Sequence, residues 1–281
     1  MTMCRSTVAV CDVQLTFLLG ADHIVIYDWN TSLTTRGVVR HFAARCRDKR
    51  RCRVDVIDWR LPKTVDASIW YHGQSLAVQD CLYRQMASSR YVVFNDIDEY
   101  LVPHDRHIAN WTELARSLDR PLRCGYQFLS AFFDPAAMPA SMAQPPVKGD
   151  VRRSPTKPDL MTMRSTQRSQ HVSNIRTKCM VRPYEIFEAG IHHISKPIWA
   201  FLTVDRVDTE VALLHHYRKC VGTYGMNCAG TVDDSTVLRY SHDLALSTAD
   251  VWSELVNILY SQSPLQWQKE RAQMGKLPQG E

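Results

Sequence analysis

The sequence has no CxxC pair and no cysteine–histidine spacing typical of zinc motifs, although nine of its 281 residues are cysteines. It also has no internal repeat and no apolar run long enough to span a membrane. Met1–Val13 lacks a basic start followed by a clean apolar core, so no signal peptide is predicted. We therefore expect one globular domain, and we expect the chain to be a fragment of a longer parent protein.

Positive charge is not spread evenly along the chain. The formal net charge is +5, but the stretch Val147–Arg182 alone holds nine lysine or arginine residues and two aspartates. The remainder is slightly acidic, which argues against a general nucleic-acid surface. We expect residues 135–172 to form a flexible basic loop, and the Lys178 end of the stretch to become ordered over an anionic ligand.

Cysteines and sequons indicate the compartment. Two pairs of cysteines are close enough in sequence to close small loops, although connectivity cannot be derived from spacing: Cys46 with Cys52, and Cys220 with Cys228. Asn30-Thr-Ser and Asn110-Trp-Thr are N-glycosylation sequons. Together these features favour a secretory-pathway lumen over the cytosol.

Strand and helix patterns alternate along the first hundred residues. Strands are predicted at His23–Tyr27, Val54–Trp59 and Tyr91–Asn95, with helices near 34–44 and 74–88 between them. This β-α-β-α-β order predicts an α/β fold with a Rossmann-type, doubly wound, mostly parallel sheet flanked by helices. Further on, we predict a helix at Trp111–Leu118, strands at Gly125–Phe133 and Val211–Tyr217, and a closing helix at Val251–Tyr260.

The most informative motif lies in Tyr91–Pro103, YVVFNDIDEYLVP, where an apolar run ends in Asp96, Asp98 and Glu99. On extended backbone, side chains at i and i+2 point the same way, so Asp96 and Asp98 can reach one hard cation, Mn²⁺ or Mg²⁺. Sugar-nucleotide transferases hold a divalent metal against a diphosphate with this Asp-x-Asp pattern. A solvated turn at the strand end is the alternative.

A phosphatase of the haloacid-dehalogenase type also places Asp-x-Asp after a hydrophobic strand. It normally has this strand near the N-terminus and a Thr or Val two residues after the second Asp. Here Tyr100 occupies that place and two β-α units come first, so this class is disfavoured.

Five blocks, in order, resemble glycosyltransferase family 92: FLLGADHIVIYDWNTS, YHGQSLAVQDCLYR, YVVFNDIDEYLVP, KCMVRPYEIFEAGIHHISKP and LLHHYRKC. The resemblance covers about residues 17–220. It implies a GT-A-like fold and a metal-dependent, inverting enzyme that transfers galactose from UDP-galactose to a glycan on a glycoprotein or glycolipid. It also implies a Golgi or secretory-pathway lumen, with a membrane anchor in the full-length parent.

The resemblance also sets the domain boundaries. Family members carry a strand and a helix before the first block, and residues 1–16 do not match them. We therefore expect a divergent segment 1–16 that lacks the N-terminal strand, a glycosyltransferase domain at 17–260 and a polar tail at 261–281. A truncated, catalytically inactive relative that binds a glycan or a partner protein is the alternative function.

Roles for single residues follow from the resemblance and from chemistry. Metal ligands are expected among Asp96, Asp98 and the late histidine His216. The candidate contacts to the nucleotide sugar are Asp28, Gln74, Asp80, Asp96, Lys178 and Arg218. Glu188 is the candidate general base. Bland alternatives stay open: a turn-forming role for Asp28, a hydrogen-bonded core position for His216, and solvated positions for Lys178, Arg218 and Glu99.

Overall fold

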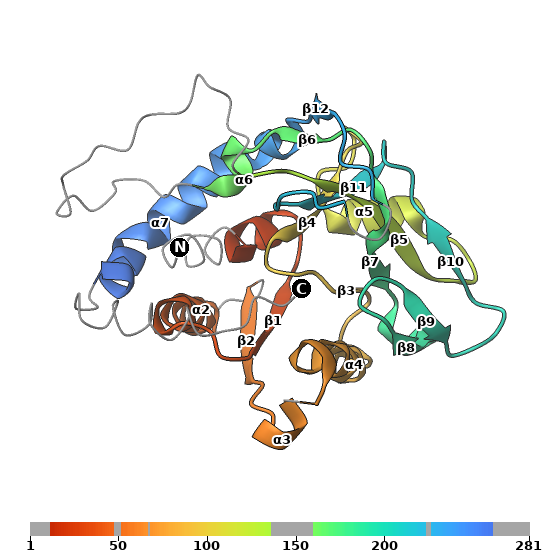
Figure 1. Cartoon of the computed structure of the whole chain (residues 1–281), viewed down its shortest axis with the longest axis horizontal. Helices are drawn as coiled ribbons and strands as arrows, with labels where there is room; N and C mark the ends of the chain where they lie inside the picture. Colours follow the sequence, from red (N-terminus) through yellow and green to blue (C-terminus); the bar gives the residue numbers. More distant parts are fainter. Residues whose placement is uncertain (1–11, 48–51, 67, 136–159, 223–225, 261–281) are drawn as a thin grey trace.

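The computed structural model describes residues 12–47, 52–66, 68–135, 160–222 and 226–260 (Figure 1). The predicted segment 1–16 and tail 261–281 lie wholly or mostly outside these residues. The described chain forms a parallel pair of strands, a larger mixed sheet and helices packed around both. It is therefore a mixed α/β protein.

The parallel pair consists of β1 (His23–Asp28) and β2 (Arg53–Asp58), joined through helix α2 (Leu33–Cys46). The β-branched and aromatic residues of β1 favour a strand, and Ser32 caps α2 by accepting a hydrogen bond from the backbone of Thr35 at 3.1 Å. The long helix α7 (Ser241–Tyr260) packs against α2 (Figure 1). These three predicted elements are confirmed, while α7 begins ten residues before its predicted start.

The larger sheet has six strands, in the order β3-β7-β5-β11-β4 with β10 also paired to β5. Only the pairings of β5 with β11 and with β10 are parallel. The pairings β3–β7, β5–β7 and β4–β11 are antiparallel. The strands are β3 (Val92–Val93), β4 (Glu99–Pro103), β5 (Arg123–Phe132), β7 (Ser173–Val181), β10 (Thr203–Arg206) and β11 (Ala212–His216).

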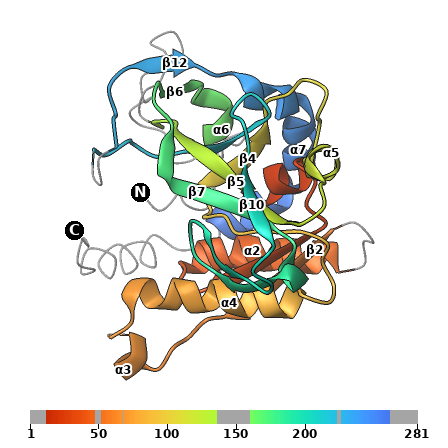
Figure 2. The ribbon, with the colours of Figure 1, turned by 90° about the vertical axis from the view of Figure 1, so that its right-hand side faces the viewer.

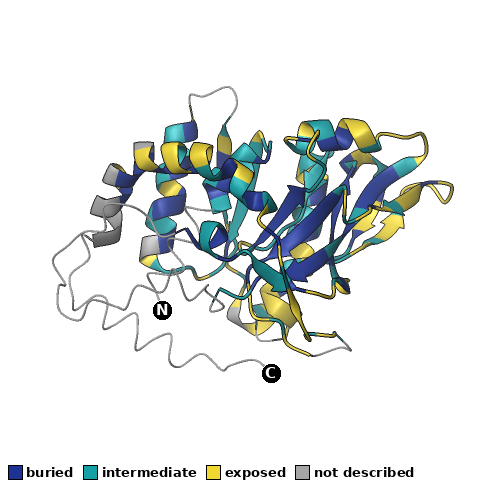
Figure 3. Cartoon of the chain, turned by 90° about the horizontal axis from the view of Figure 1, so that it is seen from above, coloured by how far each residue is buried: buried dark blue, intermediate teal, exposed yellow. Residues whose placement is uncertain are grey.

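The predicted doubly wound, mostly parallel sheet is therefore not confirmed, because this sheet is mixed and β1–β2 is hydrogen-bonded apart from it. The prediction took Leu101–Pro103 as an exit from the acidic strand. Those residues instead belong to β4, which pairs antiparallel with β11. All five residues of β4 and all five of β11 are buried, so this pair forms the centre of the core (Figure 3).

The remaining elements surround the two sheets. Helix α4 (Gln74–Gln85) lies at one side of the molecule beside the hairpin of β8 (Ile186–Ala189) and β9 (Ile194–Pro197) (Figure 2). Tyr83 in α4 donates a hydrogen bond of 2.7 Å to the carbonyl of Phe187. The other elements are α3 (Lys63–Asp66), η1 (Trp70–Gly73), α5 (Trp111–Leu118), α6 (Met161–Arg164), β6 (Gln167–Ser169), η2 (Pro183–Glu185), β12 (Thr231–Asp233) and η3 (Thr236–Tyr240).

The basic stretch differs from its prediction. Residues 136–159 lie outside the described chain, but the rest of the predicted loop contains α6 and β6, and β6 pairs with β12. Lys178 lies in β7, a strand with neighbours on both sides, and is 2% exposed. A lid that closes with its Lys178 end is therefore wrong for this residue, since a paired strand is already ordered.

Both predicted cysteine pairs form disulfides, Cys46–Cys52 and Cys220–Cys228. Among the described helices, none combines the length and the hydropathy that crossing a membrane requires. Cys46 is buried against the packed faces of α2 and α7, so its disulfide closes a loop at the end of α2 inside the core.

We expect the double variant Cys220→Ser/Cys228→Ser to unfold with a free energy lower by about 2.5 kcal/mol. The reason is the chain entropy that an eight-residue loop regains in the unfolded state when its cross-link is removed. Urea unfolding of variant and wild type under oxidising conditions measures the difference. In reducing buffer the two midpoints should coincide, and a difference that persists there would contradict this explanation.

Candidate functional site

The acidic motif is a turn between two strands. The backbone N–H of Glu99 donates to the carbonyl of Asp96 at 3.0 Å, which closes a four-residue turn between β3 and β4. The prediction assumed extended backbone, on which Asp96 and Asp98 would point the same way. That assumption is wrong, because the turn sends the two carboxylates toward different partners.

Asp96 faces helix α4 and strand β7. Its Oδ1 accepts a hydrogen bond of 2.8 Å from the side-chain amide of Gln74, and its Oδ2 lies 3.3 Å from the Lys178 ammonium. Gln74 is the first residue of α4 and follows three left-handed residues: Tyr71, His72 and Gly73. A side chain on Gly73 would also press on Leu61 at 3.1 Å, so glycine suits this sharp start of the helix.

Glu99 is buried beneath Asp96 and paired with Lys178. Its Oε2 lies 3.0 Å from the Lys178 ammonium and accepts the backbone N–H of Asp96 at 2.9 Å. Burial lowers the pKa of Lys178, but the two carboxylates outweigh it and hold that pKa above its usual value. Burial raises the pKa of Glu99, and Lys178 counteracts this rise. The pair therefore fixes the acidic turn to β7.

Asp98 faces the end of β11. Its Oδ2 lies 3.7 Å from His216 Nε2, and its backbone carbonyl accepts the N–H of Tyr217 at 2.8 Å. Burial acts to raise the pKa of Asp98, but His216 and the nearby Arg218 outweigh it and bring the pKa below its usual value. His216 Nδ1 in turn lies 3.3 Å from Glu99 Oε1. One side chain thus links Asp98 to the buried ion pair.

Asp28 and Asp80 have other partners. Asp28 accepts a hydrogen bond of 2.7 Å from Arg36, in the first turns of α2, and a second bond from Thr31. Burial raises the pKa of Asp28, but these hydrogen bonds outweigh it and lower that pKa. Asp80 accepts from Arg84 and, at 2.6 Å, from the Tyr27 hydroxyl. Both therefore stay predicted contacts, and α4 connects β1 to the acidic turn through Tyr27 and Gln74.

Glu188 lies on the exposed side of β8, in register with Lys196. Within the described part of the chain, no hydrogen bond or ion pair joins Glu188 to Asp96 or Asp98. Its role as a base therefore stays a prediction. Arg218 is exposed just past β11, on the side of Asp98.

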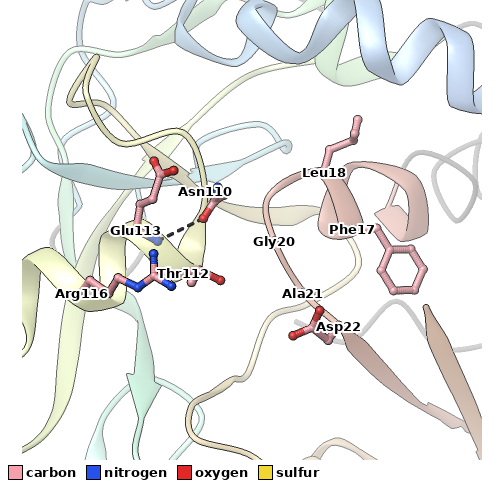
Figure 4. A pocket seen from close by; sticks show the side chains of 9 residues that line it. All are labelled: Phe17, Leu18, Gly20, Ala21, Asp22, Asn110, Thr112, Glu113 and Arg116. Carbon is pink, nitrogen blue, oxygen red and sulfur yellow. Dashed lines mark hydrogen bonds between the residues drawn. The ribbon is translucent and has the colours of Figure 1, made fainter. Parts of the chain in front are cut away.

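A separate open hollow of about 650 Å³ lies between the turn at residues 17–22 and helix α5 (Figure 4). Phe17 and Asp22 line one side, and Asn110 and Arg116 line the other. Asn110 also caps α5 by accepting the backbone N–H of Glu113 at 3.0 Å. None of the predicted site residues lines this hollow, so it is distinct from the acidic turn.

Sequence reasoning underrated Glu99 and Lys178. A solvated acid and a solvated lysine were the open alternatives, yet both side chains are buried and bonded to one another. The available signal was the position of each residue in an apolar run: EYLV after the turn, and KCMV in β7. A charge inside such a run needs a buried partner.

The fold and this site together are consistent with a GT-A-like glycosyltransferase: a mixed α/β protein in which an acidic turn faces a histidine, a buried lysine and an exposed arginine. The chain belongs to glycosyltransferase family 92, whose sequence model matches residues 12–249. The resemblance of the five sequence blocks is thus confirmed.

One curated relative is the beta-1,4-galactosyltransferase galt-1 of Caenorhabditis elegans, which is 29% identical to this chain over 187 residues. The aligned part covers 66% of this chain and 38% of that protein. The chain therefore spans well under half the length of this relative.

Proposed function

We propose that this chain is the catalytic unit of a metal-dependent, inverting glycosyltransferase that moves galactose from UDP-galactose to a glycan acceptor. Family membership supports sugar transfer, and the name of the relative supports galactose as the sugar. The observation that carries the proposal is the turn at Asp96–Glu99, which presents Asp98 toward His216 and Arg218.

The residues present fit a divalent ion. Asp98 Oδ2 and His216 Nε2 are 3.7 Å apart, and one ion with bonds of about 2.1 Å can lie between two atoms at this separation. A carboxylate with a lowered pKa and an imidazole suit Mn²⁺, with Mg²⁺ as the second choice. Asp96 is held farther round the turn and stays a predicted third ligand. When bound, such an ion neutralises charge on a departing diphosphate.

The chain's own groups bind and orient the donor. Arg218 is exposed beside Asp98, where its charge complements a diphosphate. Gln74 and Lys178 hold the Asp96 carboxylate in one orientation, so that it can accept a hydrogen bond from a ribose or sugar hydroxyl. Inversion requires a single displacement in which a base takes the proton of the acceptor hydroxyl, and Glu188 stays the candidate for this base.

The proposed setting is the lumen of the Golgi or of another secretory compartment, with membrane anchoring in the full-length parent. The two disulfides and the exposed sequon residue Asn30 support an oxidising, glycosylating compartment. The proposed partners are a UDP-sugar donor and a glycan acceptor on a glycoprotein or glycolipid.

A donor panel tests the proposal. We expect the purified full chain with Mn²⁺ to release UDP from UDP-galactose faster than from UDP-glucose or UDP-N-acetylglucosamine, and EDTA to stop the release. NMR of a product made on a fucosylated N-glycan should show a β-linked galactose, since the donor is the α-anomer. An α-linked product would contradict inversion, and glycan binding without UDP release would favour the inactive binding module.

A further inference from the structure

Three buried side chains outside the donor site converge on one point. His104 directly follows β4, His215 lies in β11, and Asp234 directly follows β12. His215 is 0% exposed and Asp234 is 7% exposed. Successive side chains on a strand point to opposite faces, so His215 and His216 face opposite sides of β11. The cluster is therefore separate from Asp98.

The three ligand atoms fit a single small ion. His104 Nε2 lies 2.8 Å from His215 Nε2, and Asp234 Oδ2 lies 3.6 Å from the first and 3.9 Å from the second. A triangle with these sides has a circumscribed radius of about 2.0 Å, which equals the usual bond length from Zn²⁺ to histidine nitrogen or carboxylate oxygen. One point thus lies at bonding distance from all three atoms.

Without an ion, the same atoms satisfy one another poorly. At 2.8 Å one imidazole must donate its proton to the other, and at 3.6 and 3.9 Å neither nitrogen is within hydrogen-bonding distance of Asp234 Oδ2. In the described part of the chain, the buried Nδ1 of His215 has no hydrogen-bond partner either. Buried polar atoms are normally paired, so this cluster calls for a further group.

The surrounding contacts hold the ligands in place and select the ion. Asp234 accepts from Arg168 Nε at 2.9 Å and from the backbone of Thr236 at 3.2 Å, while Phe133 stacks on His215 with ring centroids 4.3 Å apart. Such outer contacts orient metal ligands. Because Arg168 offsets the charge of Asp234, charge attraction alone would hold an ion weakly. This disfavours Ca²⁺ and Mg²⁺, which bind oxygen, and favours an ion that binds neutral imidazole.

We propose that His104, His215 and Asp234 bind a structural Zn²⁺, with water at the fourth tetrahedral position. The ion connects the ends of β4, β11 and β12, and so attaches the β6–β12 ribbon to the main sheet. The spacing of these ligands, 104, 215 and 234, resembles no zinc motif, which explains why the sequence gives no sign of the site.

Metal analysis of the full chain tests the site. Protein expressed with zinc and then dialysed should retain about one Zn²⁺ per chain, and Asp234→Asn and His104→Ala should each lose it. The exposed His107 provides a matched control on the same loop, and His107→Ala should keep the metal. His216→Ala should also keep it, because His216 faces the donor site. Cobalt-substituted wild type should show the intense visible bands of tetrahedral Co²⁺.

Thermal unfolding guards against variants that fail to fold. A strong chelator should lower the Tm of wild type and of His107→Ala but leave the Tm of Asp234→Asn unchanged. If both ligand variants misfold, zinc content and the cobalt spectrum of wild type still decide. Wild type without zinc after zinc-supplied expression, or zinc lost from His216→Ala and retained by Asp234→Asn, would overturn the proposal.

Discussion

Asp98→Asn is expected to lower sugar transfer about 100-fold or more and to remove the gain in UDP affinity that Mn²⁺ provides. Asparagine keeps the shape of the side chain but loses the charge that faces His216 at 3.7 Å. The pKa of Asp98 lies below its usual value, so the carboxylate is ionised at neutral pH in the wild type. Calorimetry of UDP binding with and without Mn²⁺ measures the effect.

Asp58 offers a matched control for this substitution. It ends β2, is exposed, and pairs with Arg60. Asp58→Asn should therefore leave both UDP affinity and transfer close to wild type. If Asp98→Asn binds UDP with the same Mn²⁺ dependence as wild type, Asp98 is not a metal ligand and the proposed mechanism must change.

Lys178→Met is expected to lower the free energy of unfolding by about 3–5 kcal/mol at neutral pH. Methionine fills a similar volume, but it leaves the buried Glu99 carboxylate without its countercharge at 3.0 Å. The double variant Lys178→Met/Glu99→Gln should recover much of the loss, because a neutral glutamine can still accept the N–H of Asp96. Chemical unfolding of the two variants and wild type forms the measurement.

The stability loss of Lys178→Met should depend on pH in a defined direction. Burial already raises the pKa of Glu99, and removal of Lys178 raises it further. A carboxyl whose folded pKa is raised favours folding in its protonated form, so the loss is smallest below the ordinary glutamate pKa of about 4.3. The loss then grows as pH rises through the folded pKa. A loss that is constant between pH 4 and pH 7 would show that packing, not charge, is responsible.

Local patterns in the sequence predicted much of the fold. Helix α5 has its predicted bounds, and β1, α2 and β2 lie within a few residues of theirs. In each case the apolar period or a capping residue acts within one element, as with Ser32 before α2. The β4–β11 pairing could not be predicted in this way, because antiparallel pairing between residues more than 100 positions apart depends on tertiary packing.

The site was predicted in composition but not in geometry. The residues Asp96, Asp98, Gln74, Lys178 and His216 do gather around one turn. Their division into two groups could not be derived, because the turn at Asp96–Glu99 depends on the buried pair of Glu99 and Lys178. Charge alone marked both residues as solvated, and only the burial of β4 and β7 reverses that expectation.

The register between β4 and β11 has a consequence for how this chain tolerates change. His216 lies opposite Glu99 and His215 opposite Tyr100. A slip of β11 by one residue would turn His216 toward Asp234 and His215 toward Asp98, so that every contact on both faces would be exchanged at once. An insertion or deletion within 212–216 should therefore be far more damaging than any single substitution there, and length variation in this protein must lie in its loops.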